Sequence, residues 1–377
     1  MRKGWEYKKL GDCTQILDSQ RKPVTKKDRK SGIYPYYGAT GIQDYVDKYI
    51  FDGRYVLVGE DGAKWSSFTQ SAFIIEGKTW VNNHAHVLRT NDFLVDSFLV
   101  YFLNYSDLDS YISGAIIRKL TQASLRNIDI PLPPKSTQLA IVSELDKINE
   151  LIRLKKEQLK DFDDLAQSLF YEMFGDPVEN EKGWEVKKLG EVCEVTSAKR
   201  VFIDEVVESG VPFIRGTELT ALSKLVPGEK MDYTLFITYE HYERLKAITG
   251  VPKIGDLLIP SINADGIVWM VDTEDPLYFK DGRVLWVHVN HEYYNSIAIQ
   301  KLMNVLIKNV FTSMGGATFA ELKLFVLRNM NVPTPPLSVQ DAFSEKIKQI
   351  DAQKLQVKKS IQDLETLLAS RMQYWFE

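Results

Sequence analysis

The sequence predicts an α+β protein in which two similar mixed α/β domains are separated by two long helices that form an antiparallel coiled coil. Three observations predict this fold class. One sequence block opens both halves of the chain, a proline-rich block closes both globular regions, and a long heptad pattern follows each proline-rich block. Together they indicate an internal duplication with pseudo-two-fold symmetry.

The duplication is visible in blocks that return in the same order. They are GWEYKKLGD at 4–12 with GWEVKKLGE at 183–191, LRNIDIPLPPKSTQ at 125–138 with LRNMNVPTPPLSVQ at 327–340, and a Gly-Ala pair at 114–115 with another at 316–317. The offset is 179 residues for the first block and 202 for the others, so the second copy is longer by about 23 residues in its middle. Chance is a poor explanation for matched blocks in matched order.

Both globular regions read as mixed α and β. Short β-branched and apolar runs bounded by glycine or asparagine predict strands at 55–59, 72–77 and 84–89, and a helix over 96–112 with Asp96 or Ser97 as its N-cap. The second copy has VPFIRG, GDLLIPS and VLWVHV in the same order, followed by a helical pattern over 293–309.

Each proline-rich block is followed by a segment with no internal proline or glycine, in which apolar residues alternate at spacings of four and three. This is the seam pattern of a coiled coil. The predicted seam contains Ile141, Leu145, Ile148, Ile152, Lys155, Leu159, Phe162, Ala166, Leu169 and Met173, and then Phe343, Ile347, Ile350, Lys354, Val357, Ile361, Leu364, Leu368 and Trp375. A helix over 138–174 would be about 55 Å long.

Two features of these helices bear on function. Paired antiparallel, they would hold the two globular domains at a fixed separation. The seam lysines Lys155 and Lys354 have two open interpretations: a polar seam residue can fix the register of the pair, or it can simply reach out to water.

Composition restricts the classes of function. The chain has 377 residues with a formal net charge of −4, so it is not a general polycation, and any nucleic acid would be bound through local patches or with a partner's help. Two cysteines give no disulfide framework and favour a reducing, cytoplasmic setting. The first residues lack the apolar core of a signal peptide, and no run is long enough to span a bilayer.

One stretch of the first domain is typical of a nucleic-acid contact. The basic run RKPVTKKDRK at 21–30 stands beside IYPYYGATGIQDYV at 33–46, which crowds aromatic, glycine and hydroxyl residues together. Basic loops can hold phosphates, amides and hydroxyls can read base edges, and glycines permit close backbone approach. Alternation favours internal packing for Tyr34 and Tyr36, and Tyr37, Thr40 and Gln43 are expected to face outward. A merely solvated basic surface is the alternative interpretation.

The complete set of predicted DNA-binding residues covers both domains. It comprises Arg21, Lys22, Lys26, Lys27, Tyr37, Thr40, Gln43, Lys64, Ser66, Arg118 and Lys119 in the first domain, and Lys199, Arg200, Arg215, Thr217, Ser261, Asn263 and Arg283 in the second.

Catalytic motifs are missing from the sequence. There is no GxxxxGK[ST] phosphate loop, and the two Pro-Pro pairs follow Leu132 and Thr334, where an adenine methylase would need Asn or Asp. His84 and His86 share one face of a strand but have no evident third ligand, so no metal site is expected. We therefore predict no catalytic residues and no cofactor in this chain.

The paired GWxxKKLG starts, the IPLPP and VPTPP junctions and the two long helices resemble the specificity subunits of type I restriction-modification systems. YPYYGATGIQDYVDKYIFDGRYVLVGEDG with WVNNHAHVL is similar to one common class of target recognition domain, and VPFIRGTEL with GDLLIPSINADG resembles another. The resemblance covers nearly all of the chain. It assigns residues 1–133 and 177–335 to target recognition domains 1 and 2, 134–176 to the central conserved spacer helix, and 336–377 to the C-terminal one.

This resemblance implies a non-catalytic reader of DNA. Each target recognition domain would read one half of a bipartite, asymmetric site in double-stranded DNA, and the paired helices would set the spacer and dock two methyltransferase subunits. Restriction subunits would join for cleavage. S-adenosylmethionine, ATP and Mg²⁺ are expected on those partner subunits, and no membrane association is expected.

Two other classes of function stay open at this point. One is an autonomous DNA-modifying enzyme, either a nuclease or a fused methylase, which the missing motifs disfavour. The other is a coiled-coil scaffold with protein-binding heads, because a coiled coil alone does not name its partner.

Overall fold

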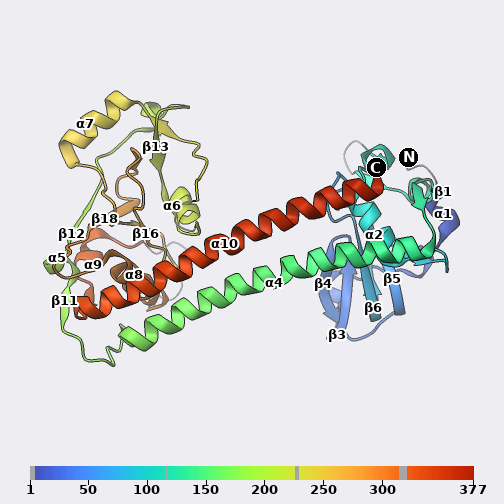
Figure 1. Ribbon diagram of the computed structural model, residues 1–377, viewed down its shortest axis with the longest axis horizontal. Helices are drawn as coiled ribbons and strands as arrows, with labels where there is room; N and C mark the ends of the chain where they lie inside the picture. The colour runs from blue at the N-terminus through green and yellow to red at the C-terminus, as the bar shows by residue number, and fades with distance from the viewer. Residues whose placement is uncertain (1–4, 115–117, 226–228, 314–320) are drawn as a thin grey trace. The chain divides into compact units, whose positions relative to one another are not determined.

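The computed structural model describes residues 5–114, 118–225, 229–313 and 321–377 (Figure 1). Its contacts divide it into two compact units, Met1–Lys156 with Ser360–Glu377, and Glu157–Lys359. The long helices α4 (Lys135–Phe174) and α10 (Leu337–Phe376) each contribute residues to both units. Of the repeated blocks, Gly4, Ala115, Gly316 and Ala317 lie outside the described residues.

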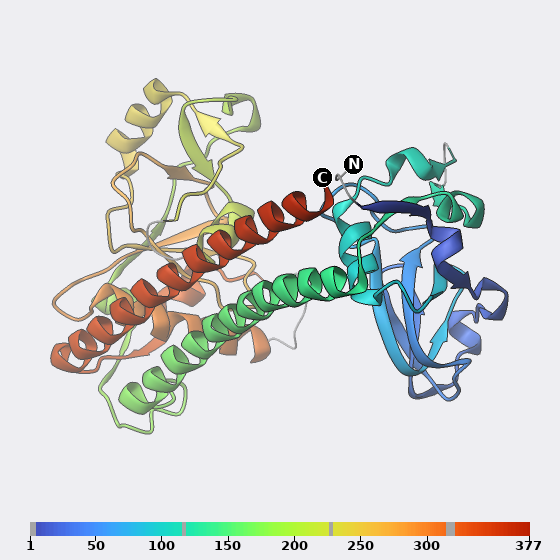
Figure 2. The ribbon, with the colours of Figure 1, turned by 45° about the vertical axis from the view of Figure 1, so that its right-hand side comes forward.

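The first unit is built on a six-stranded sheet with the order β2-β7-β5-β6-β3-β4 (Figure 2). Its strands are β2 (Thr14–Ile16), β3 (Ser31–Gly38), β4 (Gly41–Val46), β5 (Phe51–Gly59), β6 (Ala72–Val81) and β7 (Ala85–Thr90). Neighbours pair antiparallel except β3 and β6, which run parallel. Because the central strand β5 ends in a run of buried residues, the sheet centre is also the core of the unit.

Shorter elements of the first unit tie the chain ends to this sheet. They are β1 (Glu6–Lys9), α1 (Leu10–Cys13), η1 (Asp18–Gln20), η2 (Lys26–Asp28), α2 (Asp96–Tyr105), η3 (Asp109–Tyr111), β8 (Ile112–Ser113), β9 (Lys119–Leu120), α3 (Gln122–Arg126) and β10 (Asp129–Leu132). Strand β1 pairs with β10 in the repeated block, so the start and the end of the globular region meet just before α4.

Helix α2 differs from its prediction at both ends. The helix ends at Tyr105, not at 112, because the Ser106 hydroxyl and amide both donate to the Phe102 carbonyl, and the Asp107 carboxylate then accepts from the Asp109 amide. Such local side-chain bonds compete with helix continuation. At the other end the N-cap is Val95, not Asp96 or Ser97.

The second unit repeats this plan with smaller sheets. A four-stranded sheet has the order β12-β18-β15-β16, and a three-stranded sheet has the order β14-β13-β17. The strands are β11 (Val186–Lys188), β12 (Glu194–Ser197), β13 (Val211–Ile214), β14 (Phe236–Ile237), β15 (Leu257–Pro260), β16 (Trp269–Met270), β17 (Tyr278–Phe279), β18 (Val284–His288) and β19 (Asn331–Pro333). The pair β11-β19 repeats β1-β10, so the same closure precedes α10.

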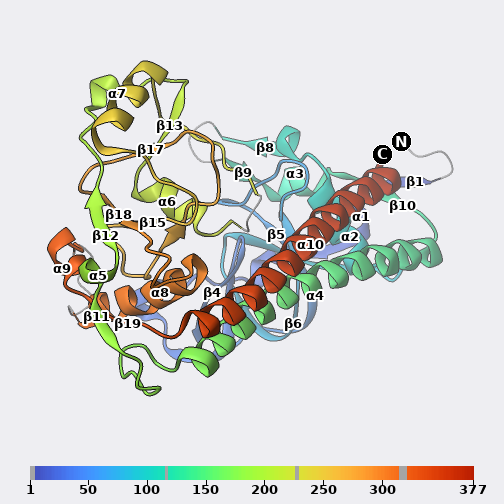
Figure 3. The ribbon, with the colours of Figure 1, turned by 60° about the vertical axis from the view of Figure 1, so that its left-hand side comes forward.

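The helices of the second unit that have a counterpart in the first unit follow the same order along the chain, and Figure 3 labels α5 to α9. The helices of the second unit are α5 (Leu189–Val192), η4 (Ile203–Glu205), α6 (Gly216–Leu222), α7 (Tyr239–Thr249), α8 (Ser296–Ser313) and α9 (Leu324–Arg328). Helix α8 takes the place of α2, and α9 that of α3. Helices α6 and α7 lie in the part of the second copy that is longer.

A buried glutamine starts both long helices in the same way. The Gln138 side chain accepts from the Val95 amide and donates to the carbonyls of Phe93 and Pro133. In the second unit the Gln340 side chain accepts from the Asn295 amide and donates to the carbonyls of Tyr293 and Pro335. Both glutamines are fully buried. The duplication is thus conserved in individual hydrogen bonds, because buried backbone groups at helix ends need partners.

Within the first unit, α4 and α10 pair antiparallel. Glu144 accepts hydrogen bonds from Arg371 and Trp375, and Lys156 contacts Glu365 at 2.9 Å, so position numbers rise along one helix as they fall along the other. The buried seam residues of this part include Ile141, Leu145, Ile148 and Ile152.

The second unit shows the same antiparallel pairing. The rings of Phe174 and Phe343 lie 4.9 Å apart, and the Lys354 ammonium contacts the Asp163 carboxylate at 2.7 Å. The Lys354 side chain therefore extends from the seam toward Asp163, a largely exposed residue on the facing helix. No predicted seam residue is exposed in either unit. The antiparallel coiled coil between two mixed α/β domains is confirmed.

In the part of the chain that the structure describes, no helix has both the length and the apolar character needed to cross a membrane.

Candidate nucleic-acid interface

The predicted residues of the first domain gather where β5 ends. Three contacts bring their segments together. Arg21 donates to the Ala85 carbonyl at 2.8 Å, Asn82 donates to the Gln43 carboxamide at 3.1 Å, and the Lys119 ammonium contacts Glu60 at 2.7 Å. The basic loop, the β3–β4 hairpin and the loop after β5 therefore start from one place, which is what a composite binding surface requires.

The basic loop has a largely buried arginine, Arg21, and exposed lysines. The Arg21 guanidinium is largely buried and binds Glu60, Asp18 and backbone carbonyls inside the domain. Lys22, Lys26 and Lys27 are exposed, the last two on η2. Exposed lysines suit phosphate contacts, which position a duplex without reading its sequence.

The aromatic hairpin follows the predicted alternation. Tyr36 is buried and its hydroxyl accepts from the Val24 amide at 3.0 Å, and Tyr37 is half-buried against Phe73. Thr40 and Gln43 are exposed near the turn. These positions match the expected outward members, although the ring of Tyr37 also packs inward.

Gly38 and Gly41 in this hairpin allow the turn to form and leave room for the Gln43 side chain. A side chain at Gly38 would collide with Gln43, and Gly41 has a φ of +133°, which L-residues rarely adopt. The hairpin therefore keeps its shape and its Gln43 position through glycine, which fits a loop that presents an amide at its tip.

The loop between β5 and β6 carries a second group. Lys64 and Ser66 are exposed and line a depression together with Arg118, whose guanidinium pairs with Asp109 at 2.8 Å. In the same loop Phe68 has a φ of +59° and stands with its ring edge against Tyr105. A non-glycine residue in this region is strained, and such strain clusters at functional loops. Sequence reasoning missed Phe68 because no pattern marks it.

The second domain brings most of its predicted residues into one depression. Arg215, Thr217, Ser261 and Arg283 line it, with Gly216, Thr220, Pro260, Ile262 and Lys280. Lys280 was not predicted, and the only available signal was its place in the FKDGR turn that leads into Arg283. Arg200 and Lys199 lie beside this region, because Arg200 contacts Asp281 at 3.1 Å.

Several of these second-domain side chains also bind within the domain. Arg215 pairs with Glu218 at 2.9 Å, and Arg283 pairs with Glu321 at 3.2 Å. Ser261 is buried and donates to Glu321. Burial acts to raise the pKa of Glu218, but hydrogen bonds from Arg215 and Thr217 lower it to about 2. The arginines are thus held in place by carboxylates, as preorganised groups are.

Asn263 has a purely internal geometry. Its carboxamide is buried, donates to the Ile267 carbonyl at 2.6 Å and accepts from the Ile267 amide at 2.5 Å. It closes the turn after β15, so any effect on a ligand would pass through the shape of that turn.

The two depressions occupy equivalent places in the repeat. The Glu60 amide donates to the His84 carbonyl and the Leu120 amide donates to the Glu60 carbonyl, just as the Ser261 amide donates to the Arg283 carbonyl and the Leu322 amide donates to the Ser261 carbonyl. This bond pattern makes Glu60 and Ser261 equivalent. Each domain therefore has a basic, hydroxyl-bearing surface at the loop that follows its central strand.

Among the described residues, one group of carboxylate and imidazole ligands is close enough to suggest a metal ion, namely Asp18, Glu60 and His86. The group already holds cations, because Arg21 and Lys119 both pair with Glu60. A set of ligands neutralised by arginine and lysine is poorly suited to a divalent ion.

Comparison with known proteins agrees with this arrangement. Residues 2–161 and 181–366 match the family described as type I restriction modification DNA specificity domain. A Haemophilus influenzae protein assigned as a type I restriction enzyme specificity subunit is 32% identical over 342 residues, covering 89% of this chain and 84% of that protein. The type I restriction enzyme MjaVIII specificity subunit of Methanocaldococcus jannaschii is 23% identical over 375 residues, covering 92% and 86%.

Two solved structures share the fold. The S subunit of a type I restriction-modification system from M. genitalium has a TM-score of 0.57 at 15% identity, with 99% of this chain and 96% of that chain covered. A chain from a study of complex assembly and conformational transition in the type I R-M system has a TM-score of 0.60 at 17% identity, with 100% and 98% covered. With both of its globular domains matched, the chain belongs to the family of type I restriction-modification DNA specificity proteins.

Proposed function

We propose that this chain reads a bipartite, asymmetric sequence in double-stranded DNA, with each domain contacting one half of the site. The observation that carries the proposal is the duplication of the depression at equivalent loops, after β5 in one domain and after β15 in the other. The two surfaces differ in side chains, so the two half-sites should differ in sequence.

The function is specificity and not catalysis, in agreement with the relatives, which are named specificity subunits. We propose that exposed Lys22, Lys26, Lys27, Lys64 and Lys199 meet phosphates, and that Thr40, Gln43, Ser66 and Thr217 are available to base edges. Arg21, Ser261 and Asn263 would act indirectly, by fixing the loops from inside.

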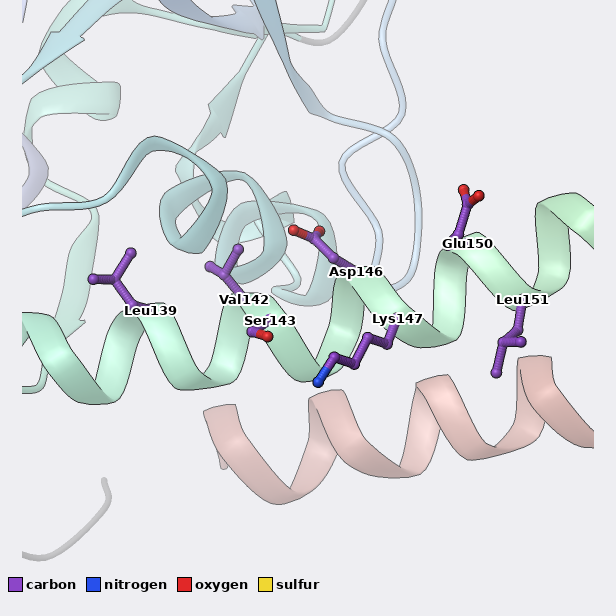
Figure 4. A pocket seen from close by; sticks show the side chains of 7 residues that line it. All are labelled: Leu139, Val142, Ser143, Asp146, Lys147, Glu150 and Leu151. Carbon is purple, nitrogen blue, oxygen red and sulfur yellow. The ribbon is translucent and has the colours of Figure 1, made fainter.

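The paired helices are proposed to set the unread spacer and to dock two methyltransferase subunits, with restriction subunits joining for cleavage. One candidate docking surface is a groove along α4 lined by Leu139, Val142, Ser143, Asp146, Lys147, Glu150 and Leu151 (Figure 4). Leu139 and Leu151 are about half exposed there. Apolar side chains left in contact with water on a helix suit a partner protein.

S-adenosylmethionine, ATP and Mg²⁺ are proposed to be bound by those partner subunits. The proposal also includes the cytoplasmic location expected from the sequence. Neither alternative, an autonomous DNA-modifying enzyme or a scaffold with protein-binding heads, is favoured by the relatives' names.

A domain exchange tests this proposal. Residues 14–125 are replaced by the same region of another specificity subunit, and methylated adenines are mapped in cells that carry the complete system. One half of the methylated motif should change and the other half should remain. A motif that stayed whole, or changed in both halves, would overturn the assignment of one half-site to each domain. Methylation by the lone chain would instead support the autonomous enzyme.

A further inference from the structure

A buried ionic cluster lies beneath the loops of the first domain. It contains the carboxylates of Asp18 and Glu60, the His86 imidazole, the Arg21 guanidinium and the Lys119 ammonium. Asp18 lies where the basic loop begins, Glu60 follows β5 where the Lys64 loop begins, and Lys119 is next to Arg118. All three segments carrying predicted phosphate contacts thus start at this cluster.

Two hydrogen bonds join His86 to separate segments of the domain. Its Nε2 lies 2.8 Å from the Leu120 carbonyl oxygen and must donate, because that oxygen can only accept. Its Nδ1 lies 2.6 Å from Asp18 Oδ2. The ring therefore links the start of the basic loop to the backbone beside Lys119.

Asp18 has further partners inside the domain. Its Oδ1 accepts from the Val87 amide at 3.0 Å, and its Oδ2 also accepts from the Gln122 side chain at 3.1 Å. Burial acts to raise the pKa of Asp18, but the hydrogen bonds from His86 and the Val87 amide, with the charge of Arg21, lower it below its ordinary value. Burial likewise acts to raise the pKa of Glu60, and Lys119 and Arg21 lower it. Both acids are therefore charged at neutral pH.

The charged groups facing His86 come from every packed segment. Asp18 and Arg21 come from η1 and its end, Glu60 from the end of β5, and Lys119 from β9. The nearby His84–Asp61 pair, at 2.5 Å, is at the surface outside the cluster. The His86 side chain is 1% exposed, so water cannot replace its bonds.

The second domain lacks this cluster at equivalent positions. The strand registers of β12 and β18 pair Ser197 with Leu285, where the first domain has Asp18 and His86. Ser261 replaces Glu60, and Glu321 replaces Lys119. The duplicated fold is thus built without the ionic cluster, so the fold alone does not demand it.

We propose that His86 is a positioning residue for DNA recognition by the first domain, with its buried ring holding the starts of three DNA-contacting loops in one arrangement. This inference rests on the proposed function. It concerns a residue that touches no DNA and acts through Asp18, Glu60 and the Leu120 carbonyl.

The test uses His86→Gln and His86→Asn in the complete methyltransferase complex. Each amide has one nitrogen where the imidazole has two on opposite sides of the ring, so it cannot reach both Asp18 and the Leu120 carbonyl in the same way. The probe is a set of duplexes bearing the wild-type motif, mapped beforehand, with single substitutions in either half. Discrimination against changes in the first domain's half-site should fall about tenfold, the usual weight of one base pair. Discrimination in the other half should not change.

His84→Gln is the matched control, because it makes the same substitution at an exposed site two residues earlier. Discrimination in both half-sites should stay unchanged in this variant. A purely structural role would lower the yield or melting temperature of the His86 variants but leave the motif intact, and that outcome would overturn the proposal. If the wild-type complex showed no bipartite motif, the proposed function would fail instead.

A second measurement does not depend on any variant folding well. Long-range ¹H–¹⁵N spectra of the full chain, labelled at histidine, report whether each ring nitrogen carries a proton. We expect His86, assigned by the disappearance of its signals in either variant or by its Leu120 contact, to carry a proton on Nε2, the nitrogen that faces the Leu120 carbonyl. An Nε2 without a proton would contradict the proposal.

Discussion

The two domains share a hydrogen-bonded frame and differ in chemistry where their loops leave the sheet. At the end of β5 the first domain gathers four charged side chains around the buried His86. At the end of β15 the second domain has Ser261, with Glu321 and Arg283 at its rim. The backbone bonds around Glu60 and Ser261 are the same. Duplication has kept the main-chain pattern and left side chains free to diverge, which is what a protein reading two different half-sites needs.

The largest expected effect comes from the buried seam residues of the two long helices. Ile141 and Phe343 lie at seam positions in the two copies, and both are fully buried. Phe343→Ala should reduce the free energy of unfolding by about 3–5 kcal/mol, because it leaves a cavity beside the rings of Phe170 and Phe174. Ile141→Ala should cost about 2–5 kcal/mol. Hydrogen exchange should show each loss mainly in its own unit.

Leu154→Ala is the control for these two variants, because Leu154 is on the same helix as Ile141 but about half exposed. Its effect should stay near ~0.5 kcal/mol, the usual range at surface sites. Equal loss of hydrogen-exchange protection in both units from either core variant would mean that the two copies do not have independent cores, contrary to this prediction.

Acid should weaken both domains, each through a buried carboxylate of its own. The folded-state pKa of Asp18 is lowered, and that of Glu218 is lowered to about 2. A lowered carboxyl pKa stabilises the fold above the unfolded value and loses that contribution as pH falls through the folded value. Both domains should therefore weaken below about pH 4, each by about 1–3 kcal/mol for the charged hydrogen bonds that protonation removes.

Two reciprocal variants check this assignment. Asp18→Asn should reduce the pH dependence of hydrogen-exchange protection in β5 and β7 only. Glu218→Gln should reduce that dependence in β13 and β15 only. Urea unfolding at pH 7 and pH 3, followed by hydrogen exchange, measures both. A single variant that flattened the response of both domains would show that the acid effect is not local.

The smallest effect is expected at the exposed lysines. Lys26→Ala with Lys27→Ala should leave the melting temperature unchanged and weaken DNA binding by the complex similarly for all sequences. The slope of log affinity against log salt should fall by about 0.9 for each phosphate that is no longer neutralised. Lys182→Ala, also exposed but in the connection before β11, is the control. A change in the motif itself would show that these lysines read bases.

Sequence reasoning predicted the repeat because matched blocks can be compared directly in the sequence, and the seam because it depends on the periodic spacing of residues close in the chain. It placed the end of α2 wrongly, because Ser106 and Asp107 form local bonds that a hydropathy pattern does not reveal. The strand order of the six-stranded sheet depends on distant pairings such as β3 with β6, which no local signal specifies.

The candidate site was less predictable than the fold. The charge of Arg21 was evident, but its internal partner Glu60 is 39 residues away, and the pattern could not show that the guanidinium is buried. His86 has the same difficulty, since its partner Asp18 is 68 residues away. For Asn263, the pattern could not show that the carboxamide is buried. Residue type indicates what a side chain can bond to, and only the fold determines whether its partner is DNA or the domain itself.

We propose that each domain reads one half-site and that the paired helices set the gap between the two. The most direct test inserts one heptad into α4 within 144–160 and one into the facing part of α10, then maps methylated adenines. A heptad adds about 10 Å of helix, or about three base pairs of duplex. We expect the same bases in both halves with a longer gap. An unchanged gap with altered bases would contradict this proposal.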